Sequence, residues 1–434
     1  QGSRARCIEK RAEILWLPGS LGVMCLSPAA SVAASSSLEL RIARLGEGGG
    51  GGRGQGRGGG GPARRRLGIA LLSALLSAAL SMIPSFTAAR GLALAQALGG
   101  AGRGRARARA SIPRDPTPPQ PAPSGPALKV LSWNVNGLRA LLKKEDGALL
   151  SELLAAEAPD ITLFQEHRLQ QSHLAETEPQ LLALFDEALP GEPHCATWAV
   201  STGRKGYSGS CAIYRPSAGG GIVGSGAGEV NDIDALEGRS VRLDLACGLT
   251  VVGAYVPNSG RGLSRLDYRV GTWDVELISY LKRLREPGSG ELLLCGDLNV
   301  AHTDADCHNP GAKHIRKQAG CTQEEMASFS RVLEECDLVD VWRHIHPDAR
   351  GVFTYWSQVA KNRPYNQGLR IDYFLASRGL FEGKGLSDKD GSRASKEKAS
   401  DPSSPTGPIG FHDCEVLDSV MGSDHCPITC TLLL

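Results

Sequence analysis

The stretch ELLLCGDLNVAH, from Glu291 to His302, decides how this chain of 434 residues is interpreted. It contains the apolar run Leu292 to Cys295, which has the length and composition of a buried β-strand. Gly296 ends the run, and Asp297 and Asn299 follow. Gly, Asp and Asn are common turn residues, but a strand end is also a rigid support for a general base or a metal ligand. The stretch alone leaves both interpretations open.

The same arrangement recurs from Leu128 onward. Apolar patterns predict strands at 128–134, 161–164, 249–255 and 369–375, helices at 147–158, 272–286 and 324–336, and a last strand after His425. Ligand sites of α/β sheets lie where strand ends converge, so we predict one shared site. The polar residues at or beside these strand ends are Asn134, Asn136, Glu166, Tyr255, Asn258, Asp297, Asn299, Asp372, Asp424 and His425.

This set is rich in carboxylate and amide oxygen atoms, and the chain has neither an HExxH motif nor a Cys/His cluster. Those features favour a hard cation such as Mg²⁺ or Mn²⁺ over zinc. A hard cation held by few carboxylates usually acts on a phosphate group. No GxxxxGK[ST] loop is present, which argues against nucleoside triphosphate transfer. His425, oriented by Asp372, could hydrogen-bond a phosphate oxygen or accept a proton.

Charge and composition divide the chain near residue 128. Residues 1–128 contain 17 Lys and Arg against 5 Asp and Glu, and the remainder contains 31 against 41. The net charge of +2 therefore combines a basic N-terminal part with an acidic remainder, and the apolar fraction of 41% is enough for a real core. Twelve cysteines occur without a CxxC pair, which favours buried thiols in a reducing compartment over a disulfide framework or a zinc site.

Two segments precede residue 128. Residues 1–66 contain the Gly/Arg tract 48–61, and we predict that they are a disordered, low-complexity extension. Residues 67–127 hold a 17-residue apolar run followed by an Arg-rich stretch and a Pro-rich linker. They fit a targeting presequence, but an apolar low-complexity extension fits equally. Because the first residue is Gln1, we expect a processed or incomplete start.

Seven motifs follow in order after residue 128. They are SWNVNGLRA (Ser132 to Ala140), FQEHR (Phe164 to Arg168), GYSG (Gly206 to Gly209), YVPNSGRGLSRLDYR (Tyr255 to Arg269), GDLNVAH (Gly296 to His302), LRIDYFLAS (Leu369 to Ser377) and GSDHCPI (Gly422 to Ile428). Together they resemble the exonuclease III-type apurinic/apyrimidinic endonucleases of the endonuclease/exonuclease/phosphatase superfamily. GDLN or SDH alone would indicate only the wider superfamily.

The resemblance implies that residues 128–434 form a four-layer α/β sandwich, with two mixed β-sheets packed face to face and helices outside. It implies metal-dependent hydrolysis of the DNA phosphodiester 5′ to an abasic site, as in base excision repair. The implied cofactor is Mg²⁺ or Mn²⁺. The implied partner is double-stranded DNA with abasic sites, cut by a monomer without stable membrane association.

The matched motifs also imply roles for individual residues. Asp297 would activate the attacking water, and Asn299 would orient it. Tyr255 would lie against the scissile phosphate, and His425, supported by Asp372, would stabilise the charge of the transition state. The implied metal set has Glu166 as principal ligand and includes Asn134, Asn136, Asp297, Asn299, Asp424 and His425. The implied DNA contacts are Arg168, Tyr207, Asn258, Arg261, Tyr355, Trp356 and Leu369.

Two positions depart from the animal-type pattern and match bacterial members. Asn136 stands where animal enzymes carry Asp, and Leu369 stands where they place Trp against the abasic sugar. These departures leave the balance between endonuclease and 3′-5′ exonuclease or 3′-phosphodiesterase action open. Phe353, Tyr355 and Trp356 resemble the aromatic wall of the sugar pocket, although they would suit a core equally. We predict that residues 381–409 are a disordered surface loop.

The motifs and the intact site residues disfavour two alternative functions. Another superfamily phosphodiesterase, acting on RNA or a lipid phosphate, is disfavoured by the motifs at 255–262 and 368–374. A catalytically dead nucleic-acid-binding protein is disfavoured because the catalytic candidates are intact, namely Glu166, Asp297, Asn299 and His425. The acidic catalytic part predicts only a small basic DNA patch, drawn from Arg168, Arg204, Lys205, Arg261 and Arg265. The expected compartment is a plastid or mitochondrion if the N-terminal segment is a presequence, and otherwise the nucleus.

Overall fold

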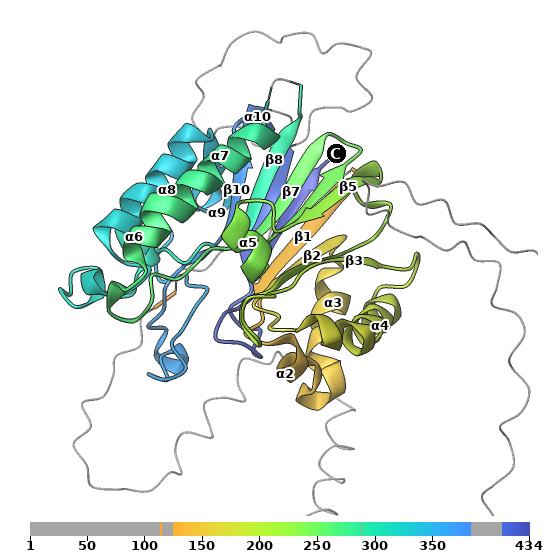
Figure 1. The fold of residues 1–434 in the computed structure, drawn as a ribbon, viewed down its shortest axis with the longest axis horizontal. Helices are drawn as coiled ribbons and strands as arrows, with labels where there is room; N and C mark the ends of the chain where they lie inside the picture. The colour runs from red at the N-terminus through yellow and green to blue at the C-terminus, as the bar shows by residue number, and fades with distance from the viewer. Residues whose placement is uncertain (1–112, 115–124, 287, 383–409) are drawn as a thin grey trace, which may run out of the picture. The chain divides into compact units, whose positions relative to one another are not determined.

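The computed structural model describes residues 113–114, 125–286, 288–382 and 410–434 (Figure 1). All of these residues belong to the compact unit Gly104–Leu434. The predicted extension 1–66 lies outside the described residues, as do most of segment 67–127 and of the predicted loop 381–409. None of the described helices is long and apolar enough to cross a membrane.

In the described part of the chain, twelve strands form two six-stranded sheets. The first sheet has the order β11-β12-β1-β2-β4-β3, with β11 Gly410–Val416, β12 Ile428–Leu433, β1 Ala127–Asn134, β2 Ile161–Gln165, β4 Ser210–Tyr214 and β3 Cys195–Ala199. The second has the order β5-β6-β7-β8-β10-β9, with β5 Ile222–Ala227, β6 Ser240–Leu245, β7 Leu249–Tyr255, β8 Glu291–Asp297, β10 Asp372–Ser377 and β9 Leu338–Asp340.

Both sheets are mixed, because β1 pairs in parallel with β2 and β7 with β8, whereas the other pairs are antiparallel. Alternate side chains of a strand point to opposite faces. In β8, Leu293 and Cys295 enter the core between the sheets, and Leu292 and Leu294 enter a second core under the helices. A strand buried on both faces needs a continuous apolar run, which is why ELLLC carries no polar alternation.

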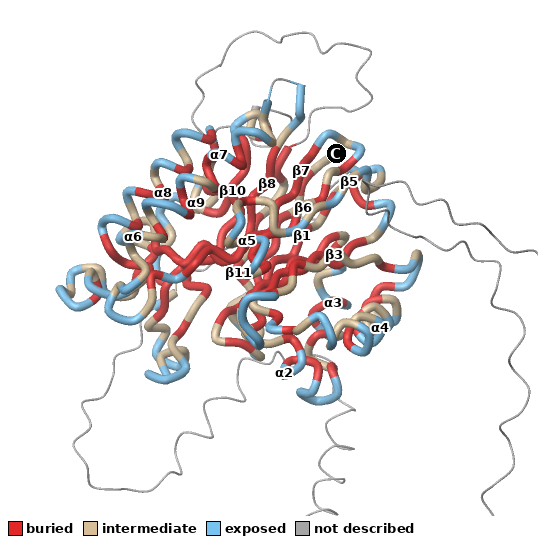
Figure 2. The backbone as a smooth tube through the Cα atoms, in the orientation of Figure 1, coloured by how far each residue is buried: buried red, intermediate tan, exposed pale blue. Residues whose placement is uncertain are grey.

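Helices cover the outer faces of the two sheets (Figure 1). Helices α2 (Leu138–Leu142), α3 (Ala148–Glu157) and α4 (Gln171–Ala188) share an apolar core with β1, β2 and β4. Helices α7 (Asp274–Leu284) and α8 (Gln323–Glu335) share another with β7, β8 and β10. The sheets form the most continuously buried part of the chain (Figure 2). Shorter helices are α5 (Asp232–Glu237), α6 (Leu266–Tyr268), α9 (Val341–Ile345) and α10 (Gly379–Glu382).

The predicted four-layer α/β sandwich is confirmed, and the expected strands and helices are present with shifted ends. Strand β8 continues through Gly296 to Asp297, and β10 begins at Asp372 and not at Leu369. The segment before Asp372 makes only isolated bridges, from Leu369 to Cys307 and Tyr355. Asp297 and Asp372 are therefore the end and the beginning of adjacent strands.

Candidate active site

Strands of both sheets bring their polar ends to one edge of the sandwich. In the first sheet, Asn134 stands level with the last residue of β2, and Glu166 follows. In the second sheet, Tyr255 at the end of β7 is the register partner of Asp297. Because β10 runs antiparallel to β8, its first residue, Asp372, also pairs with Asp297. The convergence that the sequence predicts is present.

The segment before β12 closes this edge. The Ser423 hydroxyl donates to the backbone oxygen of Asn134 over 2.8 Å, and the Trp133 indole donates to the backbone oxygen of His425 over 3.2 Å. Both bonds join the end of β1 to the segment that carries Asp424 and His425. These two side chains are therefore fixed against residues that come almost three hundred positions earlier in the chain.

Four residues of the site have left-handed backbone conformations just after strand ends. The φ values are 49° at Asn136, 53° at Glu166, 57° at Arg168 and 52° at Asn299. Asn adopts this region readily, but it is uncommon for Glu and Arg. Such conformations persist where surrounding contacts hold them, and they concentrate at functional sites.

Asp297 is the most enclosed carboxylate of the site, with 1% of its surface exposed. One oxygen accepts the backbone N–H of Asn299 over 2.9 Å, and the other accepts the side-chain amides of Asn134 (2.9 Å) and Asn299 (3.3 Å). Burial raises the pKa of Asp297 to about 7, and the negative charges of Asp372 and Glu166 act in the same direction, against His425 and Asn134. A carboxyl group with this pKa can gain or lose a proton near neutral pH.

His425 lies between two carboxylates. Its Nδ1 is 2.8 Å from Asp372, and its Nε2 is 3.8 Å from Asp297. Burial alone would lower the pKa of His425, but the charges of Asp372 and Asp297 raise it to about 10. The Thr354 hydroxyl lies 3.1 Å from the backbone nitrogen of Asp372, which orients this strand end. The imidazole is therefore held as a cation with Nε2 turned toward Asp297.

A second group of oxygen atoms surrounds Glu166. Its carboxylate accepts the Asn134 amide over 3.2 Å and the Arg168 guanidinium over 3.0 Å and 2.5 Å. Burial would raise the pKa of Glu166, but the hydrogen bonds and charge of Arg168, with help from Asn134 and Tyr255, keep it below its usual value. The Asn136 amide donates to Asp424 over 2.8 Å. Glu166 is therefore a fixed anion, and Asp424 lines the same cavity.

Two groups in the described residues could hold a metal ion. Ligand atoms of Asp297, Asp372 and His425 lie within 4.8 Å of one another, but a protonated His425 already supplies a positive charge there. The set around Glu166 offers carboxylate and amide oxygens, the donors that Mg²⁺ and Mn²⁺ prefer. Its Asn136 Oδ1 is buried without a hydrogen-bond partner among the described atoms. The Glu166 set fits a hard cation better.

Tyr255 stands between these groups. Its hydroxyl is hydrogen-bonded to Glu166, and burial followed by the charge of Glu166 raises the pKa of Tyr255 well above its usual value. The buried guanidinium of Arg239 lies 4.7 Å from the Tyr255 ring and donates to the Tyr255 backbone oxygen over 3.1 Å. Arg239 also donates to the Tyr207 hydroxyl over 2.7 Å. Tyr255 is thus a neutral proton donor held in one position.

A cleft of about 800 Å³ opens above this floor. Its walls combine cationic, aromatic and amide side chains, as a surface for a polyanion requires. Six of the seven expected DNA contacts line it, namely Arg168, Tyr207, Asn258, Arg261, Tyr355 and Leu369. Trp356 does not line it; its ring is 3% exposed in the core between the sheets, and its indole donates to Asn366 over 3.2 Å. Phe353 belongs to the same core.

Several residues near the site were not predicted from the sequence. Arg239 lies in none of the sequence motifs, and only the fold brings it to Tyr207 and Tyr255. His308, Lys317 and Gln318 line the cleft from the loop after β8. Their position just after the GDLNVAH motif was the one available clue, because such a loop must pass the end of β8.

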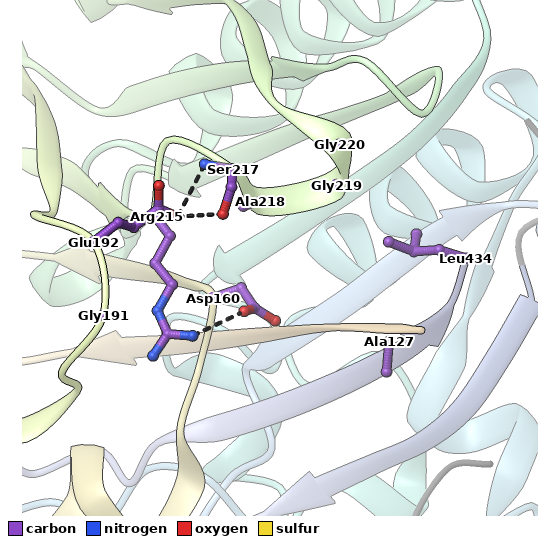
Figure 3. A pocket seen from close by; sticks show the side chains of 10 residues that line it. All are labelled: Ala127, Asp160, Gly191, Glu192, Arg215, Ser217, Ala218, Gly219, Gly220 and Leu434. Atoms are coloured by element: carbon purple, nitrogen blue, oxygen red, sulfur yellow. Dashed lines mark hydrogen bonds and ion pairs between the residues drawn. The ribbon is translucent and has the colours of Figure 1, made fainter. Parts of the chain in front are cut away.

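A second hollow, of about 410 Å³, lies at the other ends of β1 and β2 (Figure 3). It is lined by Ala127, where β1 begins, and by Asp160, which precedes β2. Arg215 lies 3.7 Å from Asp160, and the Ser217 backbone N–H donates to Glu192 over 3.1 Å. The polar groups drawn there pair with one another, and none belongs to the catalytic set.

Comparisons with known proteins give a consistent result. The Endonuclease/Exonuclease/phosphatase family matches residues 131–425. An exodeoxyribonuclease of Bacillus subtilis is 36% identical over 69% of this chain and 98% of its own length. A DNA-(apurinic or apyrimidinic site) endonuclease of Dictyostelium discoideum is 34% identical over 69% of each chain. The crystal structure of an AP endonuclease from Leishmania major matches with a TM-score of 0.57 and 28% identity, over 71% of this chain and 88% of that one.

The paired sheets and the acidic site at their common edge define an α/β-sandwich hydrolase of phosphate esters. The chain belongs to the Endonuclease/Exonuclease/phosphatase family.

Proposed function

We propose that this protein is a metal-dependent DNA endonuclease that hydrolyses the phosphodiester 5′ to an abasic site in base excision repair. The observation that carries the proposal is the buried Asp297 carboxylate, which faces the His425 imidazolium and lies beneath a cleft with cationic walls. The names of the Bacillus and Dictyostelium relatives support DNA as substrate, and the latter supports the abasic site.

Asp297 is the proposed base. Its pKa of about 7 allows it to take a proton from a water molecule at neutral pH. Asn299 fixes this carboxylate through two hydrogen bonds and is itself fixed by donation to the Val256 backbone oxygen over 2.9 Å. The Asn299 Oδ1 accepts the Asn258 amide over 2.8 Å. The base and the residue that orients the water are therefore a rigid pair, as positioning catalysis requires.

His425 and Tyr255 are the proposed donors to the phosphate. The Nε2 proton of His425 stabilises the negative charge that develops on a non-bridging oxygen, and Asp372 keeps the ring cationic and oriented. The Tyr255 hydroxyl donates from the opposite sheet. Both donors are fixed before the substrate arrives, so little reorganisation is needed during the reaction.

Glu166 would be the principal holder of a divalent cation, with Asn134, Asn136 and Asp424 as further candidates. Mg²⁺ and Mn²⁺ both suit these oxygen donors. A bound cation would neutralise phosphate charge and stabilise the leaving oxygen. The fixed negative charge of Glu166 follows from its bonds with Arg168, so the site is prepared for a cation near neutral pH.

The cleft supplies the proposed contacts to duplex DNA. Arg168 and Arg261 would meet backbone phosphates, and Tyr207 and Tyr355 would pack against the exposed sugar or bases. Leu369 offers a smaller apolar surface than an indole at the sugar position. The small side chain of Leu369 and the name of the B. subtilis relative, an exodeoxyribonuclease, both support an additional 3′-directed activity. We propose that the protein acts on this duplex as a monomer.

The experiment uses the purified full chain and a duplex with one tetrahydrofuran abasic site. We expect one cut 5′ to the site in Mg²⁺ or Mn²⁺, no cut in EDTA, and little cutting of the intact duplex, an RNA or a lipid phosphate. A recessed 3′ end measures the exonuclease activity in parallel. Cleavage that persists in EDTA, or a folded protein that ignores the abasic duplex in both metals, would overturn the proposal.

A further inference from the structure

Two cysteines meet at the ends of the loop that forms one wall of the cleft. Cys307 follows the short helical turn Asp304–Asp306, and Cys321 immediately precedes Thr322, the N-cap residue of α8. Their thiols are hydrogen-bonded to each other within a small apolar cluster that also contains Leu369. Between them, the cleft-lining residues of the loop are His308 and the segment 317–320.

Both ends of this loop are firmly held. Cys307 forms an antiparallel bridge with Leu369, and the neighbouring Asp306 is paired with the buried Arg370 over 2.7 Å. At the other end, the Glu325 carboxylate accepts the backbone N–H groups of Gly320 (2.8 Å) and Thr322 (3.1 Å). The two sulfur atoms therefore have few alternative positions, and they stay in contact in the folded protein.

We propose that Cys307 and Cys321 form a reversible disulfide under peroxide, and that this bond reshapes the cleft wall and weakens DNA binding. The effect on DNA rests on the proposed function, whereas the bond itself does not. An S–S bond of about 2.05 Å is much shorter than a thiol hydrogen bond. Closing it must draw the loop ends together and move Leu369 or Gly320, both of which line the cleft.

The chemistry balances with a hydroperoxide as oxidant. The Cys307 thiolate attacks the terminal peroxide oxygen, and the O–O bond breaks. The leaving hydroxide takes a proton to become water, or, from an organic hydroperoxide, the leaving alkoxide becomes an alcohol. Cys321 then attacks the sulfur of the resulting sulfenic acid, the S–O bond breaks, and water leaves with the Cys321 proton. Two thiols lose two electrons to the peroxide, and an external dithiol reverses the change by thiol–disulfide exchange.

The surroundings make Cys307 the attacking thiol. The hydrogen bond from Cys321 lowers the pKa of Cys307 to about 7, against the effect of burial. A hydrogen bond from the Asn309 backbone and the charge of Arg316 lower this pKa further. The same contact, with burial, raises the pKa of Cys321, so the proton stays there. Cys307 is 6% exposed and Cys321 is fully buried, so Cys307 is the more accessible of the two thiols.

The chain contains a matched control pair. Cys414 and Cys430 are register partners on β11 and β12 and are also hydrogen-bonded, but they lie in the core between the sheets. Burial raises the pKa of Cys414 well above its usual value. Burial keeps the Cys414 thiol protonated, and Cys414 and Cys430 are only 2% and 1% exposed. We therefore expect this pair to stay reduced when Cys307 and Cys321 react.

The test treats the reduced full chain with hydrogen peroxide and maps cross-linked peptides by mass spectrometry under non-reducing conditions. We expect a Cys307–Cys321 cross-link, no Cys414–Cys430 cross-link, and reversal by dithiothreitol. With abasic duplex, KM should rise by about tenfold, the equivalent of one lost charge-assisted contact, with a smaller change in kcat. Cys307→Ser and Cys321→Ser should cleave normally and resist peroxide, and Cys430→Ala should respond as the unaltered protein does.

Three outcomes would overturn the inference: no Cys307–Cys321 cross-link in a protein that stays folded, preferential oxidation of Cys414, or a cross-linked protein with unchanged KM. With Cys321→Ser, a dimedone-type trap should label Cys307, and labelling elsewhere would contradict its role as the attacking thiol. If the cross-link forms but the reduced protein does not cut abasic DNA, the disulfide stands and the proposed function fails.

Discussion

The two halves of the site hold the same chemical group in opposite states. Glu166, at the edge of the first sheet, is paired with Arg168, and its pKa lies below the usual value. Asp297, at the edge of the second sheet, has amide partners and no arginine among its contacts in the described residues, and burial raises its pKa to about 7. Two carboxylates driven apart in pKa take different tasks. One is suited to hold a cation, and the other to move a proton.

The largest expected effect follows from replacing Asp297, the proposed base. Asp297→Asn preserves the size of the side chain but removes the base, so kcat should fall by about 10²- to 10⁴-fold. DNA affinity in EDTA, measured by fluorescence anisotropy, should change little because Asp297 lies beneath the cleft lining. Asp348→Asn, an exposed carboxylate away from the cleft, is the control. A variant with near-normal turnover would remove Asp297 from the base role.

Replacing the other carboxylate should give a different signature. Glu166→Gln removes the charge that would hold the cation, so the metal concentration for half-maximal activity should rise by about 10- to 100-fold. Raising Mg²⁺ or Mn²⁺ should restore part of the rate, which it should not do for Asp297→Asn. Glu152→Gln, an exposed position on α3, is the matched control. If added metal fails to restore activity in both variants, the proposed difference in role between Glu166 and Asp297 is wrong.

The pH profile tests the proton-transfer half by itself. In the proposed mechanism Asp297 must be deprotonated and His425 protonated, so kcat should rise through about pH 7 and fall near pH 10. The Asp372 charge raises the pKa of both groups. Asp372→Asn should therefore move both limbs to lower pH. A high-pH limb that stays in place would show that His425 is not the group that limits it.

Sequence reasoning predicted the shared edge because polar residues after buried apolar runs share one end of a sheet. Strand register brings Asp297 and Asp372 together within the second sheet, and the packing of the two sheets brings Asn134 to them. The position of Arg239 was not predictable, because its partners Tyr207 and Tyr255 depend on the packing of separate strands. The strands β3 and β5, with sequences CATWA and IVGSGA, carry too little apolar periodicity to be recognised.

The aromatic segment 353–356 shows a second limit. In this segment one aromatic side chain faces the cleft and the next faces the core. Their directions depend on a bridge between Tyr355 and Leu369 that lies outside any regular strand. Tyr355 faces the cleft, whereas Trp356 is turned into the core and covered by Arg363 at 4.6 Å. An isolated bridge leaves no periodic pattern in the sequence, so composition could not distinguish the two rings.

The smallest expected effect concerns the arginine that separates the two carboxylates in pKa. Arg168 is 43% exposed, so its ion pair with Glu166 is screened by solvent. Arg168→Gln should lower kcat/KM at pH 8 by about two- to fivefold, the range of an exposed ion pair. The loss should grow below pH 6, because burial then raises the pKa of Glu166 without the opposing charge. Arg139→Gln, on an exposed face of α2, is the control.

If Arg168 acts mainly through Glu166, the metal requirement should increase more than KM for DNA. A rise in KM alone would instead show that Arg168 contacts a DNA phosphate directly. Its effect on the pKa of Glu166 would then contribute little to catalysis.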